Sequence, residues 1–288
     1  MKSLRNISGF ILLVILSANA TLAQSKARLG DNAALRYWSA FAQIQDSTIT
    51  EEQAKEFHAV LAGTAAYDDS KFKDLAEKNR SAVETMARGA ALPACDWGIE
   101  YKLGEEAPVD FVRKALLLGR LNALFVFHSM KTGDPDRAVR ALAAGLRFSR
   151  DVAKGGTLFA ALSAKDLMAI HLTAIDSTIH INELSVPQRA LLREAVVEAG
   201  PEGVDWPSAV KLEMEMLNRP DWRGSSAVEN VTHAYIAALK DPTALSKLQQ
   251  TIAAAPQQLR DLVPNPERVL EEKQDLRDKL AQARSRLQ

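Results

Sequence analysis

The sequence predicts an all-α fold, a compact bundle or array of antiparallel helical hairpins behind an N-terminal signal peptide. Hydrophobic residues make up 47% of the chain but aromatic residues only 6%, a balance that suits packed helices better than a β-sandwich. Helix start and stop signals recur along the chain, and no segment has the alternation of a half-buried strand. The 265 residues that follow a 23-residue leader are enough for a sizeable core.

The leader is predicted from the first residues. Lys2 and Arg5 precede the apolar run Phe10–Leu16, and small residues follow at Ala18, Ala20 and Ala23. This order is typical of a secretory signal, with cleavage after Ala23 or after Ala20. The alternative, an uncleaved membrane anchor, is disfavoured because the run is shorter than the roughly 20 apolar residues that cross a bilayer. We therefore expect an exported protein, periplasmic or extracellular, without a transmembrane segment in the mature chain.

The first helices are delimited by their capping residues. Asp31 can cap a helix over 32–45, and Thr50 with Gln53 forms a capping-box pattern for a helix that ends at Gly63. A third helix is expected over 71–88, ending at Gly89, and a loop through 93–108 follows it.

The middle of the chain predicts the core. Helices are expected over 109–132, 135–154 and 157–181, with Gly133 ending the first and Asp134-Pro135 starting the second. Leu, Val and Phe surround the first of these helices on nearly every side, and the third has a wide apolar arc. A helix that is apolar on most sides is usually buried by its neighbours, so these three helices should form the centre of the molecule.

The C-terminal part continues as short capped helices. Ser185 with Gln188 starts one that ends at Gly200, and others follow over 205–218, 225–239 and 241–254. A proline-rich link over 256–266 leads to a charged last helix over 267–288. The organisation we expect is thus a signal peptide over 1–23, a helical domain over 24–255, and the link with its helix over 256–288.

Two resemblances are present. The stretch from Gly133-Asp134-Pro135 through Ala138 to Gly145 resembles the turn and second helix of a tetratricopeptide unit, but no second unit follows 34 residues later. The chain as a whole resembles a group of exported bacterial helical proteins to which no function is assigned. That likeness is carried by 32–38 (NAALRYW), by 95–98 (CDWG) and by the Gly133-Asp134 helix pair. It implies a shared helical fold and supplies no catalytic residue.

Metal and cofactor sites have no sequence support. No two of the five histidines are three or four residues apart, and Asp176 with His180 gives only two ligands on one helix face. No glycine-rich phosphate loop or Gly-x-Ser-x-Gly motif is present. We expect no metal and no cofactor, and we interpret His128 and His171 as core histidines that need hydrogen-bond partners.

The weak catalytic candidates are Cys95, Asp96, His171 and Glu213. Cys95 is the only cysteine, so it forms no internal disulfide. It is either buried or paired between chains, and the adjacent Asp96 should raise its pKa rather than activate it. Acidic and aromatic residues between Cys95 and Glu106 suit a sugar-cleaving site or, alternatively, a solvated loop.

Charge and heptad spacing suggest partners. Arg140, Arg147, Arg150 and Lys154 share one stripe of their helix, which either binds an anionic partner or faces the acidic stretch 183–221. Apolar residues of the last helix, from Val269 to Leu287, have a heptad-like spacing that fits either self-association or packing on the body. The mature chain carries 34 basic and 36 acidic side chains, so no nucleic acid is expected as a partner.

Three functions fit these patterns. The first is an exported interaction or scaffold protein whose partner is another envelope protein or a second copy. The second is an envelope hydrolase with its site near the Cys95–Glu106 loop, and the third is a ligand-binding module at the same place.

Overall fold

The computed structural model describes residues 30–45, 50–178, 183–217 and 226–288, and within these ranges the chain is a helical bundle without strands. The single pairing of strand type is an isolated bridge between Asn32 and Ala94. The all-α prediction is confirmed. The leader, including the expected cleavage sites, lies outside the described residues, as do His180 and the ends of two predicted helices.

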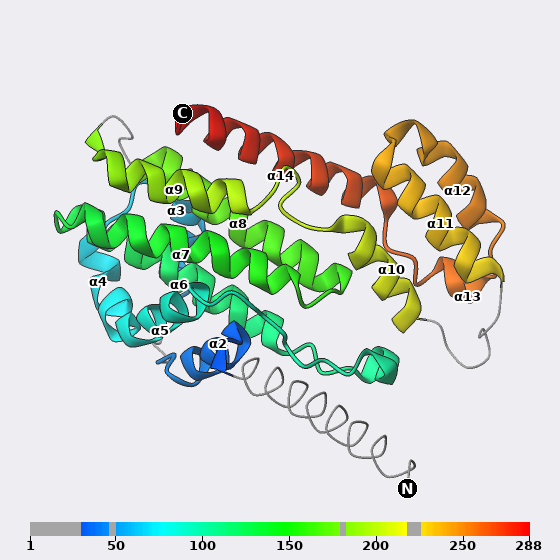
Figure 1. Cartoon of the computed structure of the whole chain (residues 1–288), viewed down its shortest axis with the longest axis horizontal. Coiled ribbons are helices and arrows are strands. Elements are labelled where there is room, and N and C mark those ends of the chain that lie inside the picture. Colours follow the sequence, from blue (N-terminus) through cyan, green and yellow to red (C-terminus); the bar gives the residue numbers. More distant parts are fainter. Residues whose placement is uncertain (1–29, 46–49, 179–182, 218–225) are drawn as a thin grey trace, which may run out of the picture.

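Three long helices form the core, as the sequence predicts. They are α6 (Phe111–Lys131), α7 (Pro135–Ala153) and α8 (Leu158–Thr178), and each packs on the other two (Figure 1). Short turns make neighbours in sequence antiparallel. Gly133 in the α6–α7 turn has φ 78°, the left-handed conformation that favours glycine. Asp134 then caps α7 by accepting a hydrogen bond from the Arg137 amide at 2.9 Å.

The apolar composition of α8 has a structural explanation. Its segment Leu158–Asp176 is long and apolar enough to cross a membrane by length and composition. In the structure it packs against α6, α7, α10 (Trp206–Met216) and α14 (Pro266–Arg286), and Leu167, Met168 and Ile175 are fully buried. A core helix with neighbours on most sides has this composition.

The N-terminal helices cover one side of this core. They are α2 (Ala33–Ala42), α3 (Glu51–Leu61), α4 (Asp69–Lys78) and α5 (Arg80–Ala90). The capping box at Thr50 and Gln53 is present, as predicted.

The single helix predicted over 71–88 is wrong, because the chain breaks at Asn79. The side chain of Asn79 is fully buried and accepts a hydrogen bond from the Gln45 amide at 2.9 Å. It also donates to the Leu75 carbonyl at 3.0 Å. This tertiary contact holds Asn79 between the two helices, as the C-cap of α4 and the N-cap of α5.

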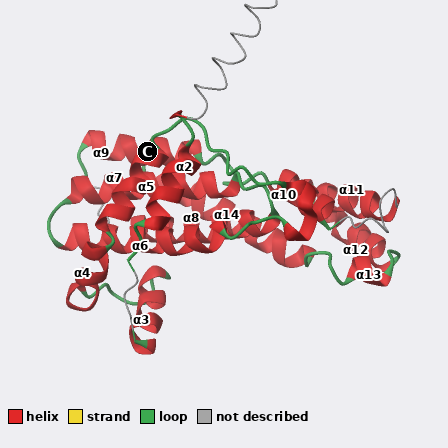
Figure 2. Cartoon of the chain, turned by 90° about the horizontal axis from the view of Figure 1, so that it is seen from below, coloured by secondary structure: helices red, strands yellow, loops and turns green. Residues whose placement is uncertain are grey.

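The C-terminal half has two parts. The helices α9 (Val186–Glu198) and α14 pack on the body, and the apolar heptad positions of α14 are buried there. The second part consists of α10, α11 (Ser226–Lys240), the 3₁₀ turn Pro242–Ala244, α12 (Leu245–Ala253) and the short α13 (Gln257–Arg260). Of these, α11, α12 and α13 project from one end of the body (Figure 2).

Candidate functional site

The loop that contains Cys95 and Asp96 is fastened to the body by hydrogen bonds. The side chain of Asn32, which caps α2, donates to the Asp96 backbone carbonyl and accepts from the Asp96 backbone amide, both at 2.8 Å. The thiol of Cys95 lies 3.9 Å from the Asp151 carbonyl oxygen, and burial, followed by the charge of Asp151, raises its pKa. A thiol with a raised pKa is a poor nucleophile.

Asp151 organises this corner of the molecule. Its buried carboxylate accepts hydrogen bonds from Tyr37 at 2.7 Å and from Lys154 at 2.6 Å, and its backbone carbonyl accepts one from the Trp97 indole at 2.8 Å. Trp97 stacks in turn on Phe111, with 4.1 Å between the ring centroids. The predicted residue Lys154 is therefore a partner of a buried acid.

His171 is fully buried between the three core helices. Its Nε2 lies 3.0 Å from Asn122 Nδ2, and its Nδ1 lies 3.3 Å from Ser149 Oγ. The amide nitrogen of Asn122 can only donate, so Nε2 of His171 accepts this bond. The Ser149 hydroxyl donates its hydrogen to the Gly145 carbonyl and therefore accepts from Nδ1. The imidazole is thus neutral, with its proton on Nδ1. Burial lowers the pKa of His171 to about 4, so it stays neutral near pH 7.

Glu213 joins α10 to the start of α8. Its carboxylate accepts a hydrogen bond from the Leu158 amide at 2.9 Å, and burial raises its pKa. The 3₁₀ turn Tyr101–Glu106 packs on α10, and the Tyr101 hydroxyl donates to the Gly155 carbonyl at 2.6 Å. Cys95, Asp96, His171 and Glu213 thus have separate hydrogen-bond partners, and no hydrogen bond or ion pair in the described residues joins any two of them. The one coupling is electrostatic: after burial and Asp151, the charge of Asp96 also raises the pKa of Cys95, as the sequence predicts.

The arginine stripe is divided by the fold. Arg147 and Arg150 lie against α9, where both contact Glu198 at 2.8 Å and 3.2 Å, and Arg147 also contacts Glu194 at 3.5 Å. Hydrogen bonds from Arg147 lower the pKa of Glu198. The acidic stretch thus neutralises these two arginines, which is one of the two alternatives in the sequence. Of the four stripe residues, only Arg140 is exposed and without an ion pair among the described residues.

His128 belongs to a polar cluster that sequence reasoning missed. Its two ring nitrogens lie 2.6 Å from Asp69 and 2.9 Å from Glu77. Burial opposes ionisation of Asp69, but hydrogen bonds from His128 and Tyr67 lower its pKa overall. Both acids are on α4, so the cluster ties α4 to α6. No group of three or more His, Cys, Asp or Glu side chains in the described ranges has the geometry of a metal site.

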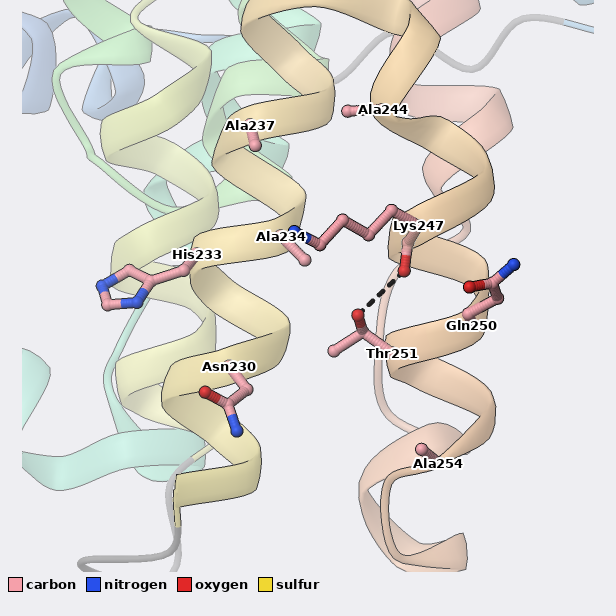
Figure 3. Close-up of a pocket in the computed structure, with 9 residues that line it drawn as sticks. All are labelled: Asn230, His233, Ala234, Ala237, Ala244, Lys247, Gln250, Thr251 and Ala254. Atoms are coloured by element: carbon pink, nitrogen blue, oxygen red, sulfur yellow. Dashed lines mark hydrogen bonds between the residues drawn. The ribbon is translucent and has the colours of Figure 1, made fainter.

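A groove lies between α11 and α12 (Figure 3). Its volume is about 630 Å³, within the range of ligand sites. Nine residues line it: Asn230, His233, Ala234, Ala237, Ala244, Lys247, Gln250, Thr251 and Ala254. Four of them are alanines, whose small side chains allow a ligand to approach the two helix backbones closely.

The polar side chains of the groove are unevenly placed. Lys247 extends across the groove toward Ala234, and Asn230 lies near the opposite end (Figure 3). The His233 ring lies at the α11 rim and turns away from α12. Thr251 donates to the Lys247 carbonyl at 2.8 Å.

The charge of the groove is positive. The ammonium group of Lys247 has no ion pair among the described residues, and none of the nine lining residues is acidic.

No local pattern in the sequence indicates this groove. The alanines and Lys247 belong to two helices, and their spacing is ordinary for amphipathic helices. The pairing of α11 with α12 brings them together.

Comparisons of the chain with protein-family models, curated protein sequences and solved structures find no match.

Proposed function

We propose that this protein is an exported helical scaffold that holds an acidic peptide segment of a partner protein in the groove between α11 and α12. The observation that carries the proposal is an open, alanine-lined groove in which Lys247 has no ion pair among the described residues and in which no lining residue is acidic. The weak catalytic candidates support an enzyme less well, because each is engaged in a structural contact of its own.

The dimensions of the groove favour a short extended segment. The groove runs from Asn230 to Ala237 on α11 and between Ala244 and Ala254, the two cap residues of α12. The helical rise over these residues gives a length of roughly 10 to 15 Å. An extended peptide of about four residues has this length. Asn230 and Thr251 offer hydrogen-bonding groups for its backbone, and Lys247 offers a charge for one carboxylate.

The test compares groove variants with matched variants on the same two helices. Ala237→Trp fills the groove, whereas Ala253→Trp places the same side chain on an exposed position of α12 outside it. Lys247→Glu reverses the groove charge, and Lys240→Glu reverses an exposed charge at the end of α11. Each variant of the chain from residue 24 is used to capture partners from an envelope fraction, with identification by mass spectrometry.

The expected result is a stoichiometric partner that binds the parent chain and both control variants but neither groove variant. Circular dichroism checks that all four variants stay folded. A partner that binds all variants equally would exclude the groove as its site. Turnover of a small substrate by the purified chain would favour the enzyme alternative.

A further inference from the structure

A second surface combines exposed apolar and basic side chains on one side of the body. Seven large apolar side chains are exposed within the described ranges, and four of them belong to α2, α6 and α8. They are Leu35, Trp38, Leu117 and Phe159, with exposed fractions from 40% to 47%. An apolar concentration of this kind on a soluble protein marks an interaction site.

Contacts place these residues on neighbouring elements. The Lys114 ammonium lies 5.9 Å from the centre of the Trp38 ring, which joins α2 to α6. On α6, Arg113, Lys114 and Leu117 lie within four residues and share the outward side. The positions of Leu35 and Trp38 are likewise one turn apart on α2.

The surface continues from α6 to α8. A Cβ added at Gly119 would lie 2.4 Å from Leu167, so the two helices are in close contact. Burial raises the pKa of the Asp166 carboxyl, and the positive charge of Arg120 acts in the opposite direction. Arg120 on α6 is therefore near Asp166 on α8. Asp166 and Phe159 are seven residues apart on α8 and therefore share its exposed side.

We propose that this α2–α6–α8 face, defined as Leu35, Trp38, Arg113, Lys114, Leu117 and Phe159, docks on the surface of an anionic phospholipid bilayer. Tryptophan and leucine enter the interfacial region of a bilayer, and basic side chains beside them bind anionic headgroups. Neither Arg113 nor Lys114 has an ion pair among the described residues, so both charges are free for lipid. The helix α6 contains no acidic residue, and Asp110 directly precedes it.

The short distance in sequence between α2 and the N-terminal apolar run is consistent with contact between this face and a bilayer. Residues 17–29 separate the apolar run Phe10–Leu16 from the first described residue, and α2 begins directly afterwards. Even fully extended, this segment spans at most roughly 45 Å. If the apolar run is the signal peptide that the sequence predicts, it keeps α2 within this distance of the bilayer until it is cleaved.

The test measures partition of the chain from residue 24, which keeps every described helix, into lipid vesicles. Co-sedimentation with phosphatidylcholine vesicles containing phosphatidylglycerol is compared with pure phosphatidylcholine. We expect binding to the anionic vesicles that falls about fivefold for each basic side chain removed, so roughly 25-fold for Arg113→Gln with Lys114→Gln. The matched control, Lys131→Gln with Lys240→Gln, changes net charge equally at exposed sites elsewhere and should bind like the parent.

Two further variants test the apolar contribution. Leu117→Gln should weaken binding, whereas Val197→Gln, which alters a more exposed apolar side chain on α9, should not. Brominated lipids should quench tryptophan emission of the parent chain and quench that of Trp38→Phe less. All seven substitutions are at exposed positions, and circular dichroism checks folding.

Several results would overturn the proposal. These are absence of vesicle binding, equal binding to both lipid compositions, and equal losses in test and control variants. A dimer in light scattering that dissociates in Leu117→Gln, without vesicle binding, would assign the face to a second copy instead.

Discussion

Mild acid should destabilise this protein through His171. Burial lowers the pKa of the folded imidazole from its usual 6.5 to about 4, so the folded chain holds this proton less well than the unfolded chain. Between these two values the unfolded state binds more protons, and the free energy of unfolding rises with pH. The stabilising contribution is therefore complete above the unfolded pKa and is lost as the pH falls from about 6.5 toward 4.

The size of the effect follows from the two pKa values. At about pH 5 relative to about pH 8, the linkage lowers the free energy of unfolding by about 2 kcal/mol, and the full difference in pKa corresponds to about 3 kcal/mol. The physical reason lies in the hydrogen bonds. A protonated ring would direct an N–H at the Asn122 amide, which already uses its other hydrogen for the Ala141 carbonyl at 3.0 Å.

Urea unfolding at the two pH values measures this effect. His171→Gln removes the titrating group, and we expect its free energy of unfolding to change between the two pH values by about 2 kcal/mol less than that of the parent chain. His58→Gln removes an exposed histidine and should retain the full dependence. If the parent and His171→Gln had the same pH dependence, the neutral, buried state of His171 would be refuted.

Two other predictions concern the packing around the core. Gly145→Ala should lower the free energy of unfolding by about 1 to 3 kcal/mol through overpacking, more than the gain of up to about 1 kcal/mol in helix propensity. The added Cβ would lie 2.3 Å from His171 Nε2 and 2.4 Å from Asn122 Nδ2. An equal cost in an Asn122→Ala background, measured by urea unfolding, would exclude the contact with Asn122 as the cause and leave that with His171. Lys165→Met should speed amide hydrogen exchange in α14, because Lys165 is largely buried and pairs with Glu272 and Asp275 of that helix. Lys279→Met, which removes an exposed pair within α14, should have a smaller effect, and equal exchange in the two variants would contradict this role.

Local signals in the sequence were enough to predict the class of fold and its centre. Capping residues such as Thr50 and Asp134 act on amides within three residues of themselves, so their effect is readable from the chain. The apolar circumference of α6 likewise shows its burial directly. Asn79 was missed for the opposite reason, because its bond to Gln45 depends on a residue 34 positions away.

The candidate site depends on tertiary pairing in the same way. Arg147 and Arg150 looked equally suited to an external anion or to an internal acid, and only the packing of α7 on α9 decides for Glu198. To predict the groove, one would have to know that none of the residues that line it with Lys247 in the folded chain is acidic. A sequence shows which charges exist, but their neutralisation depends on the order of helices in space.

The two proposed surfaces are compatible because different elements form them. The α2–α6–α8 face lies on the body, whereas α11 and α12 form a projecting hairpin beside α10 (Figure 1). No residue belongs to both surfaces. A bilayer against the first surface would therefore leave Lys247 free to bind an acidic segment, and the variants of one surface serve as controls for the other. Loss of vesicle binding in Ala237→Trp, or loss of partner capture in Arg113→Gln with Lys114→Gln, would mean that the two surfaces do not act separately.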